Sequence, residues 1–215
     1  DKHIDGHHHG IAFDVYPYIA SSTVLKEDSI KLSERVLITW SKARPDLAGR
    51  ELSDIAEELD CDIFSAAAQL QPAGAVYFAM AEEDVQRILS HPNAMIGSDG
   101  LPHDEHPHPR LWGTFPRVLG HYCRDLKLFS LEEAVRRMTG YSAETFGLID
   151  RGIIKPGAFA DITIFDEDTV LDRATFDKPM TPAAGIDTVL VNGSIVWESG
   201  GATGRRPGHV LRNGG

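Results

Sequence analysis

Short apolar runs alternate with segments of helical spacing along the first hundred residues. Between residues 53 and 70 the apolar positions recur at intervals of three and four, which predicts one or two helices. Residues 82–89 read as an amphipathic helix. Its predicted apolar face consists of Val85, Ile88 and Leu89. The strand-like runs lie at residues 11–16, 35–40, 75–80 and 94–97.

After residue 100 the apolar residues mostly follow helical spacing, and from residue 157 they alternate with polar residues, as in strands. Ser130 opens a predicted capping box for a helix through Met138, and Ser142 is expected to cap a further short helix. Asn192-Gly193 between two alternating runs predicts a hairpin turn. A helical stripe is predicted at Phe115, Val118, Leu119 and Tyr122.

The strands separated by helices are too few to close an eight-stranded barrel. An open parallel sheet would leave unpaired edges and an exposed apolar face. Two alternatives therefore stand: the first elements of the fold lie in residues absent from this chain, or the strands form a smaller open sheet.

Composition and charge narrow the class of partner. The 215 residues carry a net charge of −11, so nucleic acid and anionic membranes are not expected to bind, and a small polar substrate is. Cys61 and Cys123 are far apart and match no disulfide or metal pattern, which favours the reducing cytoplasm. The sequence has no apolar run of about 18 residues and begins without a signal pattern, although a fragment would have lost any upstream targeting segment.

Asp99 is the first candidate for chemistry. It follows an apolar strand directly and precedes a glycine, and α/β enzymes place active-site carboxylates at the carboxyl ends of parallel strands. Asp-Gly is also a common turn dipeptide, so a role as a turn or helix cap remains open.

The loop after Asp99 holds His103, His106 and His108 and ends at Arg110. Three histidines invite a metal hypothesis, but the His-Pro-His-Pro backbone is too stiff to wrap a tetrahedral ion, and a substrate-facing loop is favoured. The Arg110 guanidinium can bind a carboxylate through two hydrogen bonds, unless it is an unpartnered surface arginine.

Two other groups of polar residues lie near the N-terminus. Tyr16 and the hydroxyls of residues 21–23 follow the first strand and are expected near the same rim as Asp99, where they would bind a substrate or simply close the end of the barrel. The histidines at positions 7–9 are adjacent in sequence and are not expected to converge on one ion, so a solvated turn or a cloning remnant explains them.

Four segments together resemble the N-acyl-D-amino-acid deacylase (D-aminoacylase) family of amidohydrolases. They are residues 13–23, the Ile96-Gly-Ser-Asp-Gly100 stretch, residues 106–115 and residues 152–161. The resemblance runs from about residue 10 to the C-terminus, and the second and third segments are the specific ones.

The resemblance implies an α/β fold: the C-terminal part of a (β/α)8 barrel of the TIM type found in metal-dependent hydrolases, plus strands of a small composite β-domain. Residues 1–152 would belong to the barrel, with an insertion at about 19–80, and residues 153–215 to the β-domain. The implied activity is hydrolysis of the amide of an N-acyl-D-amino acid. Asp99 would be the general base, and Tyr16, Ser22 and Arg110 would bind the substrate carboxylate.

The resemblance also implies a catalytic zinc ion whose ligands are not in this chain. The family's His-x-His pair, metal-binding cysteine and later histidines would all lie upstream, so the partner of this chain would be the missing N-terminal half of the same protein, and the chain alone is expected to be inactive. A related cyclic-amide hydrolase, of the hydantoinase or dihydroorotase kind, and a metal-free binding module are the alternatives.

Overall fold

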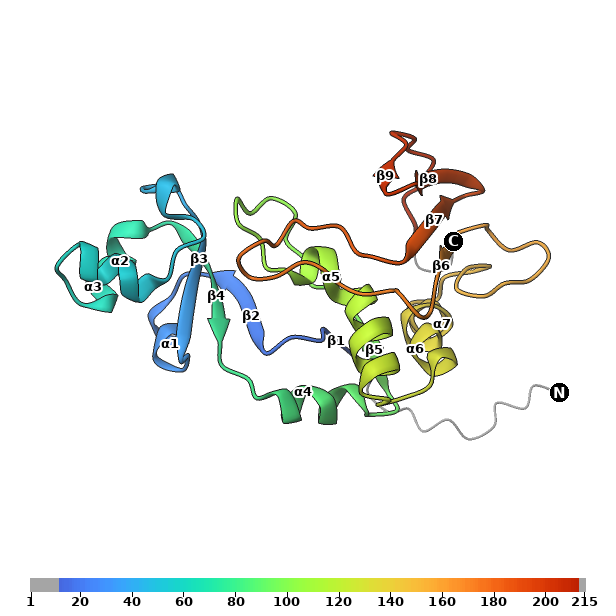
Figure 1. Cartoon of the computed structure of the whole chain (residues 1–215), viewed down its shortest axis with the longest axis horizontal. Coiled ribbons are helices and arrows are strands. Elements are labelled where there is room, and N and C mark those ends of the chain that lie inside the picture. Colours follow the sequence, from blue (N-terminus) through green and yellow to red (C-terminus); the bar gives the residue numbers. More distant parts are fainter. Residues whose placement is uncertain (1–11, 213–215) are drawn as a thin grey trace.

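A pair of parallel strands lies at the centre of the molecule. The computed structural model describes residues 12–212. In it, β1 (Phe13–Val15) pairs in parallel with β5 (Ala94–Ile96), with Val15 opposite Ile96. Parallel neighbours need a crossover connection, and here the crossover takes up the whole stretch between the two strands. Most of that stretch forms a separate body at one end of the molecule (Figure 1).

This body is an antiparallel sheet in the order β2–β4–β3, called the insertion sheet below. Its strands are β2 (Ala20–Val24), β3 (Arg35–Ser41) and β4 (Ala73–Phe78). The predicted runs at 35–40 and 75–80 are therefore strands, but they pair with each other and not with the central pair. Helices cover one face: α1 (Glu27–Lys31), the 3-10 turn η1 (Pro45–Leu47), α2 (Leu52–Glu58) and α3 (Ile63–Leu70).

The two faces of the insertion sheet have different environments. Alternation sends Ile38 and Tyr77 into a core shared with Leu52, Ile55 and Leu70 of the helices. The other face carries a smaller cluster of Ala20, Leu37 and Val76, with Phe78 and Phe176 packed against it. A bulge between Ile38 and Trp40 interrupts the pairing of β3 at Thr39. This second face looks towards the loop that follows β5.

The crossover returns through α4 (Glu82–Leu89), and helices after β5 pack on the central pair. Of the predicted apolar face of α4, Val85 and Leu89 are buried, whereas Ile88 is 40% exposed. The helices after β5 are α5 (Arg110–Arg117), the π-helix η2 (Val118–Asp125), α6 (Leu131–Met138) and α7 (Gly140–Thr145). Val118, Leu119, Tyr122 and Ala134 share a core with Ile96, whereas Phe115 is 44% exposed.

Helix capping agrees with the sequence-based prediction at Ser130 and differs from it at Ser142. The Ser130 hydroxyl accepts the Glu133 N–H at 3.3 Å, which confirms the predicted cap of α6. The Glu133 carboxylate binds Arg136 and Arg137 instead of completing the capping box. Ser142 lies inside α7, where its hydroxyl donates to the Arg137 carbonyl, so the prediction that it caps a helix was wrong.

The C-terminal residues form an antiparallel sheet beside α6 and α7 (Figure 1). Asn192 and Gly193 both have positive φ, 47° and 75°, as a type I′ turn requires, and the predicted hairpin is confirmed. The strands are β6 (Ile162–Phe165), β7 (Ile186–Val191), β8 (Ser194–Glu198) and β9 (Gly201–Ala202).

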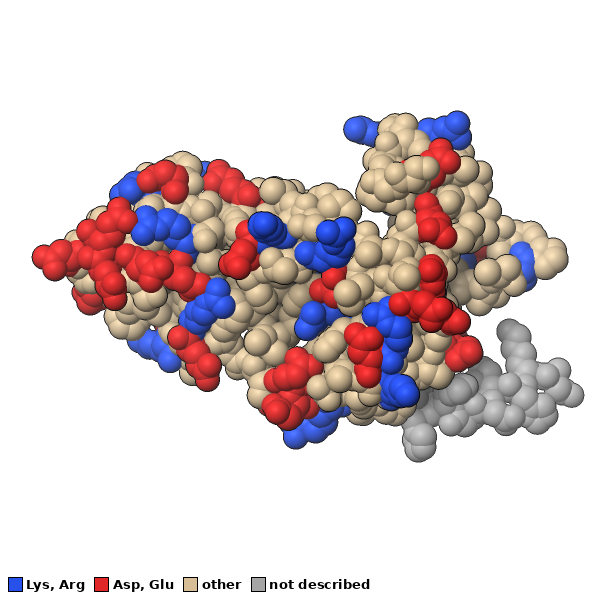
Figure 2. Space-filling model, viewed as in Figure 1, with Lys and Arg blue, Asp and Glu red and all other residues tan. Residues whose placement is uncertain are grey.

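The surface reflects the net negative charge. Figure 2 shows acidic side chains gathered at the end of the molecule formed by α2 and α3. The exposed acids of this end are Asp54, Glu57, Glu58, Asp60 and Asp62. Over residues 12–212, every helix is too short or too polar to cross a lipid bilayer.

Candidate active site

Asp99 lies just beyond the carboxyl end of β5 in an unusual backbone conformation. Its φ is +46°, in the left-handed region that residues other than glycine rarely adopt and that aspartate tolerates better than most. The preceding Gly97 has the Asp14 carboxylate where a Cβ atom would be, so only glycine fits there. The side chain of Asp99 is 59% exposed and therefore reachable by a ligand.

Arg110, the first residue of α5, brings the predicted site residues together. Its side chain is only 1% exposed, and its Nη2 forms an ion pair with Asp99 Oδ2 at 2.8 Å. The same nitrogen donates to the Ser22 carbonyl at 3.3 Å. Its guanidinium carbon lies over the Tyr16 ring, 4.5 Å from the centroid. The alternative of an unpartnered surface arginine was therefore wrong. Asp99, Ser22 and Tyr16 surround one buried cation, although their roles stay predictions.

The Arg110 guanidinium has N–H donors that form no hydrogen bond within the described part of the chain. Within residues 12–212, Arg110 Nε and Nη1 have no hydrogen-bond partner, and neither has the Ser22 hydroxyl. Buried donors left unpaired cost free energy, typically about 1–3 kcal/mol each. A carboxylate is the ligand that best matches such donors.

Tyr16 is a hydrogen-bond donor at neutral pH. Burial raises the pKa of its phenol, Arg110 opposes this, and the negative charge of Asp99 adds to it. The phenol therefore stays protonated beside Arg110 and Asp99. Only Ser22 of the three predicted hydroxyls is buried towards this site, because alternation along β2 turns Ser21 and Thr23 to the other face.

The histidines of the loop anchor it and do not converge on a metal. The His108 Nε2 atom lies 3.0 Å from the Ala20 carbonyl, and its Nδ1 accepts the Arg110 backbone N–H at 2.9 Å, which together require the neutral ring protonated on Nε2. Burial and the nearby Arg110 lower the pKa of His108 to about 3. His106 Nε2 binds the Phe176 carbonyl at 2.6 Å.

Metal ligands are not gathered anywhere in the described part of the chain. Among residues 12–212 there is no group of three or more His, Cys, Asp or Glu side chains that could hold an ion. The histidines at positions 7–9 lie outside the described residues. A resident zinc ion therefore does not fit the side chains of residues 12–212 alone.

Two buried polar residues in or beside the loop after β5 were not predicted from the sequence. Asp104 is 9% exposed, and burial raises the pKa of its carboxyl, while Thr39, His103 and Arg110 oppose that shift. Thr39 is fully buried. The sequence offered one signal for Thr39, a threonine inside the apolar run 36–40. A hydroxyl in a strand that is otherwise buried usually has a polar neighbour, because a buried polar group without a partner costs free energy.

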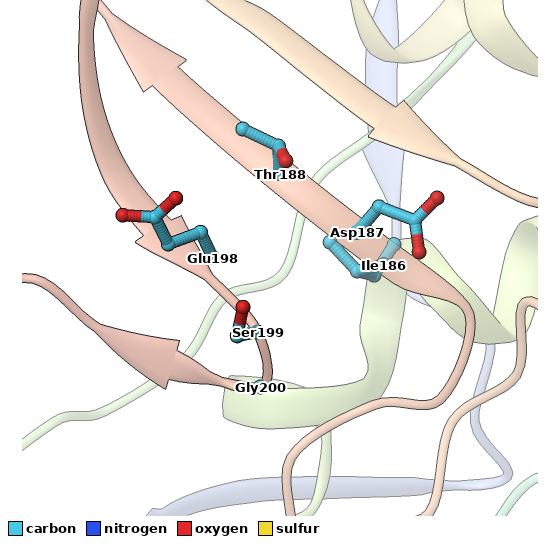
Figure 3. Close-up of a pocket in the computed structure, with 6 residues that line it drawn as sticks. All are labelled: Ile186, Asp187, Thr188, Glu198, Ser199 and Gly200. Atoms are coloured by element: carbon cyan, nitrogen blue, oxygen red, sulfur yellow. The ribbon is translucent and has the colours of Figure 1, made fainter.

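Two hollows lie away from Asp99. The first, of about 470 Å³, is bordered by the ends of β7 and β8, and Figure 3 shows its carboxylates, Asp187 and Glu198, pointing away from each other, so they do not form a joint binding site. The second is an apolar groove of about 590 Å³ between α5, η2, α6 and β6, with Phe115, Ile153 and Phe159 about half exposed along it.

Barrel enzymes place their catalytic residues at the carboxyl ends of parallel strands, which is where Asp99 lies. The profile of the amidohydrolase family matches residues 61–197. The chain belongs to the amidohydrolase family.

Relatives and solved structures place the chain more narrowly. It is 56% identical to the D-aminoacylase of Alcaligenes xylosoxydans xylosoxydans over 94% of its own length and 42% of that protein. A D-aminoacylase crystal structure, described as defining a novel subset of amidohydrolases, superposes with a TM-score of 0.90 at 57% identity, covering 94% of this chain and 42% of that one. The chain also superposes on the N-acyl-D-glutamate deacylase of Bordetella bronchiseptica with a TM-score of 0.89 at 52% identity, covering 94% of this chain and 42% of that one. That structure is a complex with zinc and a phosphonate that mimics the tetrahedral intermediate.

These matches confirm the predicted fold class, the C-terminal part of an amidohydrolase barrel with strands of a small β-domain. The chain spans about two fifths of the length of the curated relatives it matches. The domain limits at 152 and at 19–80 remain predictions.

Proposed function

We propose that the chain is the C-terminal part of a zinc-dependent hydrolase that cleaves the amide bond of N-acyl-D-amino acids, giving a carboxylate and a free D-amino acid. The observation that carries the proposal is the buried Arg110, which has unused donors and lies 2.8 Å from an exposed carboxylate at the end of a barrel strand. The three relatives that match at least 94% of the chain are named as a D-aminoacylase, an N-acyl-D-glutamate deacylase and an N-acyl-D-aspartate deacylase, which supports linear N-acyl-D-amino acids over cyclic amides.

Three side chains would hold the substrate by its α-carboxylate. Arg110 supplies the charge and the spare N–H donors, and the Ser22 hydroxyl and the protonated Tyr16 phenol supply neutral donors beside it. A carboxylate bound there satisfies groups that are otherwise buried without partners, so binding removes a cost already present in the free protein.

Asp99 would move the proton. Its carboxylate takes a proton from the attacking water as the water oxygen bonds to the amide carbon, and it returns the proton to the leaving nitrogen as the C–N bond breaks. The ion pair with Arg110 Nη2 would hold this carboxylate beside the substrate's own carboxylate. One residue thus links substrate binding to proton transfer.

Zinc and the rest of the protein enter the proposal together. Zinc lowers the pKa of a bound water towards neutral, which makes an amide open to attack. Since the side chains of residues 12–212 do not provide a zinc site, we propose that its ligands lie in the N-terminal half of the full-length protein. The unpaired edges of the β1–β5 pair and the exposed apolar groove are the surfaces on which that half would pack.

The proposed setting is the cytoplasm, with a small-molecule substrate and neither nucleic acid nor a membrane as partner. The net charge of −11 and the two free cysteines support this setting.

Replacing Asp99 with Asn in the full-length protein tests the general-base role. We expect kcat for an N-acyl-D-amino acid to fall roughly 100- to 10,000-fold, as for loss of a general base, while the zinc content per protein stays unchanged. Asp60→Asn is the matched control, since Asp60 also has positive φ (49°) but lies on the insertion beyond α2. Unchanged turnover in Asp99→Asn would refute the role given to Asp99.

A further inference from the structure

His108 forms two hydrogen bonds that join the start of α5 to β2. Its Nδ1 accepts the Arg110 backbone N–H at 2.9 Å, and its Nε2 donates to the Ala20 carbonyl at 3.0 Å. The Arg110 side chain reaches the same strand, where Nη2 donates to the Ser22 carbonyl at 3.3 Å. The backbone of Arg110, through His108, and its guanidinium are therefore both tied to the first strand of the insertion sheet.

The N–H that His108 accepts is one that α5 cannot satisfy by itself. The first N–H groups of an α-helix have no carbonyl partner within the helix. Arg110 is the first residue of α5, and the residue before it, Pro109, has no side-chain group that could accept a hydrogen bond. The imidazole takes the place of a capping side chain, so it sets the position from which the Arg110 side chain extends.

The imidazole itself is held in one orientation. It is 3% exposed and lies edge-on to two aromatic rings, with centroid distances of 5.1 Å to Tyr18 and 5.1 Å to Phe176. The prolines on both sides of it, Pro107 and Pro109, restrict the backbone. A ring fixed in this way transmits the position of β2 to α5 instead of adapting to it.

The three groups proposed to bind the substrate carboxylate share His108 as a neighbour. Tyr16 lies edge-on to the imidazole, 6.3 Å between centroids, and its ring also lies under the Arg110 guanidinium. Ser22 lies two residues from Ala20 on the same face of β2. Because the three groups come from different elements, their donors converge only if the spacing of those elements is fixed.

We propose that His108 is a positioning residue that sets the spacing of Tyr16, Ser22 and Arg110, so that their donors meet on one substrate carboxylate. The inference rests on the proposed function, because it takes that carboxylate as the shared ligand. His108 does not touch the substrate in this account. Breaking either of its hydrogen bonds leaves all three donors chemically intact but releases α5 from β2.

Two substitutions break one hydrogen bond each. His108→Asn keeps an acceptor near the place of Nδ1, for the Arg110 N–H, and is too short to reach the Ala20 carbonyl. His108→Gln keeps a donor for the Ala20 carbonyl and loses the acceptor for the Arg110 N–H. Each variant is made in the full-length protein, and either one can be measured without the other.

The test compares D-alanine with D-alaninamide, two ligands that differ in the carboxylate and lack the N-acyl bond that the proposed reaction breaks. Dissociation constants are measured by calorimetry. We expect Kd for D-alanine to rise roughly tenfold in both variants, comparable to the loss when a hydrogen-bond partner of a metal-ligating side chain is removed. Kd for D-alaninamide should stay unchanged, because the amide lacks the charge that Arg110 binds.

His91 offers a matched control. Its Nδ1 also accepts the N–H of the residue two positions on, Asn93, at 3.2 Å, but it is exposed and precedes β5, at the opposite end of that strand from Asp99. His91→Asn and His91→Gln should change neither dissociation constant.

The other outcomes overturn the inference. Unchanged binding of D-alanine would show that His108 does not set the spacing, and weakening in one variant alone would show that the link between α5 and β2 is not what matters. Equal weakening of both ligands would mean that His108 only supports the fold. Calorimetry needs no turnover, so a separate hydrolysis assay on the native protein can fail, refuting deacylation, while the comparison of the two ligands still decides the role of His108.

Discussion

Acid should destabilise the protein through His108. Its ring is 3% exposed and neutral, with Nε2 donating to the Ala20 carbonyl and Nδ1 accepting the Arg110 N–H. In the unfolded chain the ring takes up a proton near its ordinary pKa of 6.5, whereas burial, with Arg110 adding to it, lowers the folded pKa to about 3. Because the folded pKa is the lower one, the stability is fully present above pH 6.5 and is lost as the pH falls towards 3.

The size of the effect follows from the two pKa values. A change of one pH unit inside this window is worth about 1.4 kcal/mol, so acidification from pH 6.5 to about pH 5 should cost roughly 2 kcal/mol through this ring. Titrating carboxylates also contribute to acid unfolding, and a matched variant removes them from the comparison. His108→Gln retains a donor for the Ala20 carbonyl and cannot be protonated.

Urea unfolding followed by circular dichroism between about pH 7.5 and pH 5 gives the free energy of unfolding of both proteins. At the upper pH the variant should be less stable by about 1–2 kcal/mol, the cost of the unpaired Arg110 N–H. Towards pH 5 the difference should shrink by roughly 2 kcal/mol, because only the native ring resists protonation. Parallel pH dependences, or a His108 resonance that titrates near 6.5, would show that the ring is not held neutral as described.

Two further substitutions test the surroundings of the site. Arg110→Lys in the full-length protein keeps the charge but loses the planar array of donors, and should raise KM for an N-acyl-D-amino acid roughly 30-fold, the equivalent of about 2 kcal/mol from hydrogen bonds to a charged group; an unaltered KM would remove Arg110 from substrate binding. Gly74→Ala should lower the free energy of unfolding by about 1–3 kcal/mol, because the new methyl group would meet Thr39 Oγ1 at 2.6 Å and Trp40 Cδ1 at 2.8 Å. Gly201→Ala, with no described atom within 4 Å, is the control, and equal stability of the two variants would contradict the close packing at Gly74.

Local chemistry explains what the sequence could predict. Asn192-Gly193 specifies its turn through backbone conformations that few other residues adopt, and Ser130 caps α6 through its own hydroxyl. The position of Asp99 beyond the carboxyl end of β5 could be predicted because it follows an apolar strand directly, while its role stays a prediction. These features depend on residues close together in the chain.

Long-range contacts explain what the sequence could not predict. The strands at 35–41 and 73–78 have the continuous apolar runs of a parallel sheet, yet they pair antiparallel. The runs are continuous because both faces are buried, one under the helices α2 and α3 and the other against Phe176. Ser142 resembles a cap, but α7 starts at Gly140, so Ser142 is its third residue and its hydroxyl donates to the Arg137 carbonyl. The place of the loop after β5 depends on contacts of His106 and His108 with Thr39, Phe176 and Ala20, which lie far apart in the sequence.

The most direct test of the central claim is the rate of deacylation by the zinc-loaded full-length protein on a panel of N-acetyl-D-amino acids, with their L enantiomers and a cyclic hydantoin as comparisons. Turnover of the D compounds, with the L compounds and the ring slower, is the result predicted for a site that holds the substrate by its carboxylate on Arg110 and transfers the proton at Asp99. Absence of deacylation, or equal rates on the ring and the linear amides, would contradict it.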